Sequence, residues 1–499
     1  MSADLTSKTI HSLKWSYAST ITNAVMQIGY TAVMARLLEP KTFGLVAMSG
    51  VILKFGSYFA QMGMGQALIQ KKELFNDDIR AAFTSSLIMS VIFLMLTWFL
   101  APYAVLIFDN TEVIPIIRVM SISFVLTGIS TTSLALIRRN LKFKSLAVIE
   151  IISYIIGYAG IGVLFAVLGY GVWSLVFASL AQAFLSGLLS YFVTRHNLLP
   201  LFSWKKYKPL FSFGSRVSVI SFFEFLGTNL DTLFIGRMLG AGKLGLYNRA
   251  FMVVNLPMQY FTFSISRVLF PSLSRIQNDK EKLKKIYLSS ISVVGFILFS
   301  ICFGISVTAE QIVMVILGEK WIAAVPVLQI LALATPLNFI SHFDGIICDA
   351  TANLNKKLVL QTSYVIMLAG FFYFLGGFGL IGFAAGLVCA SLLRNVGYYF
   401  ITKRALGFNS KELFNSFYPS VISALFITLI IYINLILMQT FISSNLILLI
   451  GSVIIGSLSV VIFLFVKFNF RIREFLEERL LGNYKIYNSL KKVFSINTI

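Results

Sequence analysis

The chain is a succession of long apolar stretches separated by short polar turns. A stretch of about 20 apolar residues is long enough to cross the hydrocarbon core of a bilayer as an α-helix. We expect about fourteen such helices, at residues 13–35, 43–68, 81–108, 114–137, 146–168, 172–194, 212–236, 247–270, 287–308, 323–350, 358–376, 379–402, 417–438 and 445–466. The pattern therefore predicts an all-α, polytopic membrane protein.

The overall composition agrees with this pattern. Of the 499 residues, 58% are hydrophobic and only 12% are charged, and the mean hydropathy is +0.85. A soluble protein of this length would carry about 25% charged residues. No stretch has the polarity and length of a separate soluble domain, so we expect the bilayer to be the main solvent.

The net charge of +21 comes from short basic clusters between the apolar stretches. Such clusters indicate topology and contacts with anionic membrane lipids, and we expect no nucleic-acid partner. With the expected spans, 31 of the 41 basic residues fall on one side of the membrane and six on the other. Basic residues favour the cytoplasmic side, so the pattern predicts that both termini are cytoplasmic.

The chain also repeats itself. Arg36-Leu37-Leu38 and Phe43-Gly44-Leu45 match Arg237-Met238-Leu239 and Leu244-Gly245-Leu246, which lie 201 residues later. Six expected helices separate the matching points, and an even number keeps both halves in the same orientation. A parallel repeat of this kind predicts two pseudo-symmetric six-helix lobes around a central cavity.

This repeat gives the expected domain organisation. Residues 1–200 would form the N-terminal lobe with helices one to six, and residues 201–411 the C-terminal lobe with helices seven to twelve. Residues 412–468 would add two extra helices. Residues 469–499 are expected to form a cytoplasmic amphipathic tail, because they contain the segment Phe470-Arg471-Ile472-Arg473-Glu474-Phe475-Leu476.

Polar residues recur at helical spacing inside several spans. The seventh carries Ser221, Glu224, Thr228 and Asp231 on one face, and the 201-residue offset maps this face onto Thr20, Asn23, Gln27 and Tyr30 of the first. An ionised side chain facing lipid at mid-membrane costs about 2.5–3.5 kcal/mol or more. These faces are therefore expected to line a hydrated cavity.

The cavity residues divide into two groups by charge. Basic and amide side chains suit a phosphate-bearing or acidic substrate, since Arg offers paired donors and Lys a point charge. We take as substrate-binding candidates Lys54, Arg118, Arg216, Arg394, Asn23, Gln27 and Gln61. We take as candidates for binding a coupling ion Glu224, Asp231 and Asp349.

Structural roles are the alternative for each charged candidate. Arg216 and Glu224 could form an internal ion pair, and Arg118 and Arg394 could lie near lipid headgroups. A buried acid such as Asp231 could also remain neutral or salt-bridged. The three histidines are too scattered for a metal site, and no phosphate-binding glycine loop is present. We expect no cofactor, no metal and no catalytic residue.

Two segments carry a family likeness. They are Arg36-Leu37-Leu38-Glu39-Pro40-Lys41-Thr42-Phe43-Gly44 and the stretch from Leu256-Pro257 to Ile276-Gln277. Together with the helix count, they resemble the Wzx-type polysaccharide exporters, in particular the colanic-acid exporter branch. This family shares a superfamily with the lipid II flippases and the MATE multidrug exporters.

The resemblance implies a transporter that alternates between inward- and outward-open states in a bacterial inner membrane. The implied substrate is a polyprenyl-pyrophosphate-linked oligosaccharide repeat unit, moved to the periplasmic leaflet for surface polysaccharide assembly. Basic cavity residues are implied to hold the sugar and pyrophosphate, with Lys54 the first of them. Partners could include a polysaccharide polymerase and chain-length machinery.

Two other functions remain open. One is a cation-coupled multidrug exporter of the same fold, although its often cationic substrates would meet basic residues. The other is a membrane enzyme of polysaccharide assembly, such as a polymerase, which would need a sizeable outside loop. The longest expected outside loop runs only from about Arg237 to Leu246, so we expect no enzymatic activity.

Overall fold

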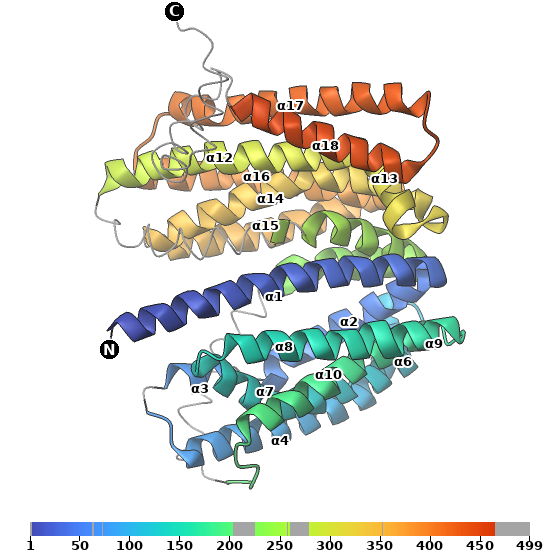
Figure 1. The fold of residues 1–499 in the computed structure, drawn as a ribbon, viewed down its shortest axis with the longest axis vertical. Helices are drawn as coiled ribbons and strands as arrows, with labels where there is room; N and C mark the ends of the chain where they lie inside the picture. The colour runs from blue at the N-terminus through green and yellow to red at the C-terminus, as the bar shows by residue number, and fades with distance from the viewer. Residues whose placement is uncertain are drawn as a thin grey trace, which may run out of the picture. The chain divides into compact units, whose positions relative to one another are not determined.

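The computed structural model describes residues 2–61, 64–71, 73–202, 225–256, 258–259, 279–351 and 353–464. Within these ranges the regular structure is entirely helical, without a strand (Figure 1). Ten helical stretches among them are long and apolar enough to cross a membrane, and one of these, Leu354–Leu406, contains two long helices of 22 and 28 residues. The prediction of an all-α polytopic membrane protein is confirmed.

Contacts divide the chain into two compact units, Met1–Asn248 and Arg249–Ile499, called unit 1 and unit 2 here. The expected domain boundaries near residues 200 and 411 stay predictions. Unit 1 contains the helices α1 (Ser2–Leu37), α2 (Pro40–Gln61), α3 (Met64–Gln70), α4 (Asn76–Leu100), α5 (Ala104–Phe108), α6 (Val113–Met120), α7 (Ile122–Arg139), α8 (Phe143–Tyr154), α9 (Val163–Val167) and α10 (Val172–Thr194), and the helical residues 225–248.

Within unit 1, α7 lies at the centre of the packing. It contacts α2, α3, α4 and α10, while α1 lies beside α8 (Figure 1). A π-helical segment, η2 (Ile155–Gly162), joins α8 to α9 and packs against α10.

Unit 2 contains α12 (Lys280–Val307), α13 (Ala309–Ile312), α14 (Val325–Ala350), α15 (Leu354–Leu375), α16 (Gly379–Leu406), α17 (Ser410–Gln439) and α18 (Asn445–Leu464). Here α12 packs against both α14 and α17, and α14 packs against α16. The last helix, α18, packs against α17.

A helix occupies the place of every expected span. The seventh and eighth lie partly outside the described residues, and the second contains α2 and α3, between which residues 62 and 63 are not described. Because the structure describes only part of these spans, the count of about fourteen membrane crossings stays a prediction. The expected cytoplasmic tail lies outside the described residues, as does most of the stretch from Leu256 to Gln277.

The two copies of the repeated motif contact each other inside unit 1, at Gly44 and Gly245. A Cβ on Gly44 would overlap the carbonyl oxygen of Ala241 and lie 2.6 Å from its carbonyl carbon. A Cβ on Gly245 would overlap the carbonyl oxygen of Pro40 and lie 2.7 Å from its carbonyl carbon. Gly44 and Gly245 match each other in the repeat, and so do Pro40 and Ala241. The contact therefore has pseudo-twofold symmetry, and its closeness requires glycine at both positions.

Candidate functional site

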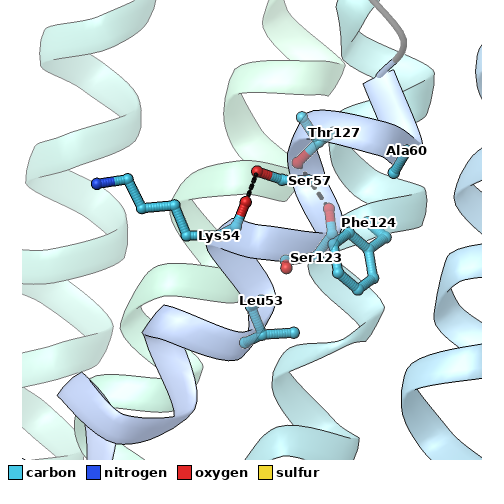
Figure 2. Close-up of a pocket in the computed structure, with 7 residues that line it drawn as sticks. All are labelled: Leu53, Lys54, Ser57, Ala60, Ser123, Phe124 and Thr127. Carbon is cyan, nitrogen blue, oxygen red and sulfur yellow. Dashed lines mark hydrogen bonds between the residues drawn. The ribbon is translucent and has the colours of Figure 1, made fainter. Parts of the chain in front are cut away.

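A pocket lies between α2 and α7 in unit 1 (Figure 2). Its volume is about 190 Å³, and its lining residues are Leu53, Lys54, Ser57 and Ala60 of α2 with Ser123, Phe124 and Thr127 of α7. Leu53, Ser57 and Ala60 recur every three or four positions, so one face of α2 supplies them, and Lys54 lies beside Leu53 at the edge of that face. The buried Phe124 ring reaches α2 at Gly56, where a Cβ would lie 2.8 Å from the end of the ring.

The hydroxyl groups of this pocket have defined orientations. Ser57 donates its hydroxyl hydrogen to the backbone oxygen of Lys54 at 2.8 Å, and Thr127 donates to the backbone oxygen of Ser123 at 2.6 Å. Among the described residues, the Ser123 hydroxyl has no hydrogen-bond partner of its own. The pocket therefore offers two oriented acceptor oxygens and one hydroxyl that can both donate and accept.

Lys54 lines the pocket, but its ammonium group lies outside the part of the pocket that contains the hydroxyls. Figure 2 shows its side chain extending away from the hydroxyls of Ser57 and Thr127, and the side chain is exposed. Its ammonium group is close enough to the carboxylate of Asp231 for an electrostatic attraction between them. The structure thus brings together a predicted substrate-binding residue and a predicted ion-binding residue.

Asp231 is held in place by its own helix. Its Oδ1 accepts hydrogen bonds from the backbone N–H of Thr232 at 2.7 Å and from the Thr232 hydroxyl at 3.3 Å. Tyr247, further along the chain, also interacts with this carboxylate. These contacts fix the direction of the carboxylate while leaving it able to attract the charge of Lys54.

Asn23 lies on α1 and forms a hydrogen bond with a residue of the neighbouring helix α8. Its Nδ2 donates to Glu150 Oε2 at 3.3 Å, and the Ser19 hydroxyl donates to the same oxygen at 3.0 Å. Gln27, one turn further along α1, is partly buried. Glu150 was not predicted as a site residue, and its one signal in the sequence is that it is an acidic residue inside the fifth expected span.

Arg118 packs against an aromatic ring of α4. Its guanidinium carbon lies 5.7 Å from the centre of the Trp98 ring, and its Nε donates to the Trp98 backbone oxygen at 3.3 Å. Trp98 is itself exposed. This arrangement is consistent with the alternative position of Arg118 near lipid headgroups. Substrate binding by Arg118 stays a prediction.

In unit 2, the polar residues of the tenth and twelfth expected spans meet between α14 and α16. Asn338 Oδ1 accepts hydrogen bonds from Arg394 Nη2 at 2.7 Å and from the Ser391 hydroxyl at 2.9 Å. The Arg394 guanidinium also lies 4.1 Å from the centre of the Tyr364 ring on α15. Arg394 is thus held by a hydrogen bond and a cation–π contact.

Two aspartates near the end of α14 have different partners. Asp349 forms an ion pair with Lys357 of α15, whose Nζ lies 2.7 and 2.8 Å from the two carboxylate oxygens. Asp344 is buried and accepts a hydrogen bond of 2.6 Å from the Tyr287 hydroxyl of α12. Asp349 was a predicted ion-binding residue, whereas its partner Lys357 and the pair of Asp344 with Tyr287 were not predicted from the sequence.

The side chains of three candidate site residues are not described by the structure. Arg216 and Glu224 lie outside the described residues, as does the side chain of Gln61 at the end of α2. The described part of the chain contains no group of three His, Cys, Asp or Glu residues that could hold a metal ion. Its cysteines are free thiols, of which Cys302 and Cys348 are buried.

The chain is similar to known proteins over most of its length. It is 28% identical over 421 residues to an uncharacterised membrane protein in the cps region of Klebsiella pneumoniae, covering 82% of this chain and 86% of that protein. It is 27% identical to the lipopolysaccharide biosynthesis protein WzxC of Escherichia coli strain K12, covering 82% and 84%.

The fold is also found among solved structures. A structure of the lipid II flippase MurJ, described as an inward closed conformation, matches with a TM-score of 0.72 and covers 90% of this chain and 98% of that one. The sequence identity is 15%, so this match concerns the fold alone. At the family level, residues 33–326 match the model described as polysaccharide biosynthesis protein, and the chain belongs to that family.

Proposed function

We propose that this protein is a flippase that moves a polyprenyl-pyrophosphate-linked oligosaccharide unit from the cytoplasmic to the periplasmic leaflet of a bacterial inner membrane. Family membership and the similarity to WzxC support a role in polysaccharide assembly. The multi-pass fold supports transport across the membrane rather than chemistry on one side of it.

The observation that carries this proposal is the position of Lys54. It lies about 21 Å along α2 from Pro40 and about 10 Å from Gln61, at 1.5 Å per residue. Its side chain is exposed in the middle of an apolar helix. Because facing lipid there would cost about 2.5–3.5 kcal/mol or more, the ammonium group is best placed in a hydrated passage.

The proposed mechanism uses this charge as a transient binding site. Before the substrate arrives, Asp231 partly compensates the charge of Lys54. The pyrophosphate then takes the place of that carboxylate as the main counter-charge, since a phosphate oxygen accepts a charge-assisted hydrogen bond from an ammonium. The polyprenyl chain remains in the lipid, and no covalent bond is broken, so the protein acts as a transporter and not as an enzyme.

The remaining predicted residues take supporting roles in this proposal. Arg118, Arg394, Asn23 and Gln27 would contact the head group along its path, and Asp231 and Asp349 would exchange a coupling ion. Both termini would lie in the cytoplasm, as the distribution of basic residues predicts. A polymerase and chain-length machinery on the other side would use the product.

Lys54→Ala is the direct test in cells. We expect surface polysaccharide to fall strongly while the amount of protein in the membrane stays the same, and Lys54→Arg to retain most of the polymer. Lys41→Ala is the matched control, because Lys41 lies at the start of the same helix in an exposed ion pair with Glu112. Normal polymer in the Lys54→Ala strain would remove Lys54 from the mechanism.

A further inference from the structure

We infer that the pocket between α2 and α7 is a subsite for one uncharged sugar ring, and that it selects among sugars separately from the charge of Lys54. This inference rests on the proposed function and names the part of the substrate that each feature of α2 would recognise.

The size of the pocket limits what it can hold. A volume of about 190 Å³ is slightly larger than that of a cavity of about 150 Å³ that holds one benzene ring. Pockets for drug-sized ligands have volumes of about 300–1,000 Å³. The pocket between α2 and α7 is therefore suited to a single ring of about a dozen heavy atoms, and any linked sugars would lie outside it.

The lining chemistry matches a polyhydroxylated ring. The oxygens of Ser57 and Thr127 can accept hydrogen bonds, because their own hydrogens are already donated to the backbone. The Ser123 hydroxyl is able to donate. Leu53 and Phe124 add an apolar surface against which the C–H face of a ring can pack. An alkyl chain in the same place would leave the Ser123 hydroxyl without a partner, which is unfavourable.

The charge distribution excludes a phosphate from this pocket. Lys54 is the one lining residue with an ionisable side chain, and its ammonium group points away from the hydroxyls (Figure 2). An anion there would be desolvated without a counter-charge, which is costly. Lys54 lies at the edge of the α2 face that carries Ser57, so a sugar in the pocket and a phosphate at the ammonium group could be bound side by side on one helix.

The test compares transport of substrates that differ by one hydroxyl. Purified protein in proteoliposomes is given polyprenyl-pyrophosphate-linked hexoses and analogues that each lack one ring hydroxyl. For each protein variant, the transport rate of every analogue is divided by that of the parent hexose lipid. We expect Thr127→Val and Ser123→Ala to change at least one of these ratios by about two- to tenfold, as expected for one hydrogen bond. Both substitutions are small enough to preserve the packing of the helices.

Thr131→Val is the matched control. Thr131 lies one turn along α7, donates its hydroxyl hydrogen to a backbone oxygen in the same way at 2.7 Å, and does not line the pocket. The relative transport rates of the Thr131→Val variant are expected to equal those of the wild type. If the pocket variants also keep wild-type ratios while Lys54→Ala still slows transport, the subsite is wrong and the proposed function stands. If the wild type moves none of these lipids, both are wrong.

Discussion

The contact between Gly44 and Ala241 predicts a specific loss of stability. In Gly44→Ala the new Cβ would lie 2.6 Å from the carbonyl carbon of Ala241 and 3.0 Å from its Cα, so the backbones have to move apart. Overpacking of this kind costs about 1–3 kcal/mol, and a clash with backbone lies at the upper end. Alanine is more favourable than glycine in a helix by about 1 kcal/mol, which offsets part of this cost. We therefore expect a net destabilisation of about 2 kcal/mol.

The symmetry of the contact makes the prediction sharper. Gly245→Ala introduces the equivalent clash with Pro40 and should have a similar effect. Once one substitution has separated the helices, the second Cβ meets less resistance, so the double variant should lose less than the sum of the two. Such non-additivity is typical of residues that share one contact.

Thermal unfolding of the purified protein in detergent measures the effect. At about 2–4 °C per kcal/mol for a unit of this size, the midpoint of Gly44→Ala should fall by roughly 4–8 °C. Gly242→Ala is the control, because a Cβ there would have no atom within 4 Å, and its midpoint should be unchanged or higher. A Gly44→Ala midpoint equal to that of Gly242→Ala would refute the reasoning.

Three further predictions concern polar contacts. Tyr287→Phe removes the hydroxyl that donates to buried Asp344, and we expect a loss of about 1–3 kcal/mol, seen as a lower thermal midpoint; an unchanged midpoint would contradict the contact. Burial lowers the pKa of His196 below its ordinary value of 6.5. Its stabilising contribution is thus present above pH 6.5 and lost as the pH falls, because the unfolded imidazole takes up the proton first. His196→Gln should weaken this pH dependence of the midpoint, and an identical profile would exclude the effect. Lys357→Met leaves Asp349 without its ion pair, but since both side chains are about one-third exposed, we expect a smaller loss than for Tyr287→Phe; an equal or larger one would show that the pair is well shielded.

The sequence predicted the helices well, because a bilayer imposes length and apolarity on each span. The prediction of helices at residues 358–376 and 379–402, for example, corresponds to α15 and α16. The repeat was also visible from sequence, since Gly44 and Gly245 occur at equivalent places. The close contact between these two glycines was not predicted, because matching positions in a repeat do not reveal which atoms touch.

The site was less predictable, since it depends on which helices are neighbours. The hydrogen bond from Asn23 to Glu150, for example, exists because α1 lies beside α8, and the sequence does not reveal this neighbour. The pocket hydroxyls of Ser123 and Thr127 gave no signal, since serine and threonine in apolar helices commonly bond to their own backbone. Lys54 was recognisable as a charge inside a span, but the direction of its side chain follows only from the packing of α2.

The proposed function requires this protein to carry a charged, lipid-linked sugar head group across the membrane with the help of Lys54. The most direct measurement is translocation in proteoliposomes, in which an enzyme outside the vesicles degrades only the lipid-linked oligosaccharide that faces it. With a lipid-linked oligosaccharide from a producing strain, we predict that the wild-type protein renders the inner pool accessible and that Lys54→Ala does so much more slowly. An inner pool that stays protected with folded wild-type protein, or equal rates for both proteins, would contradict the account.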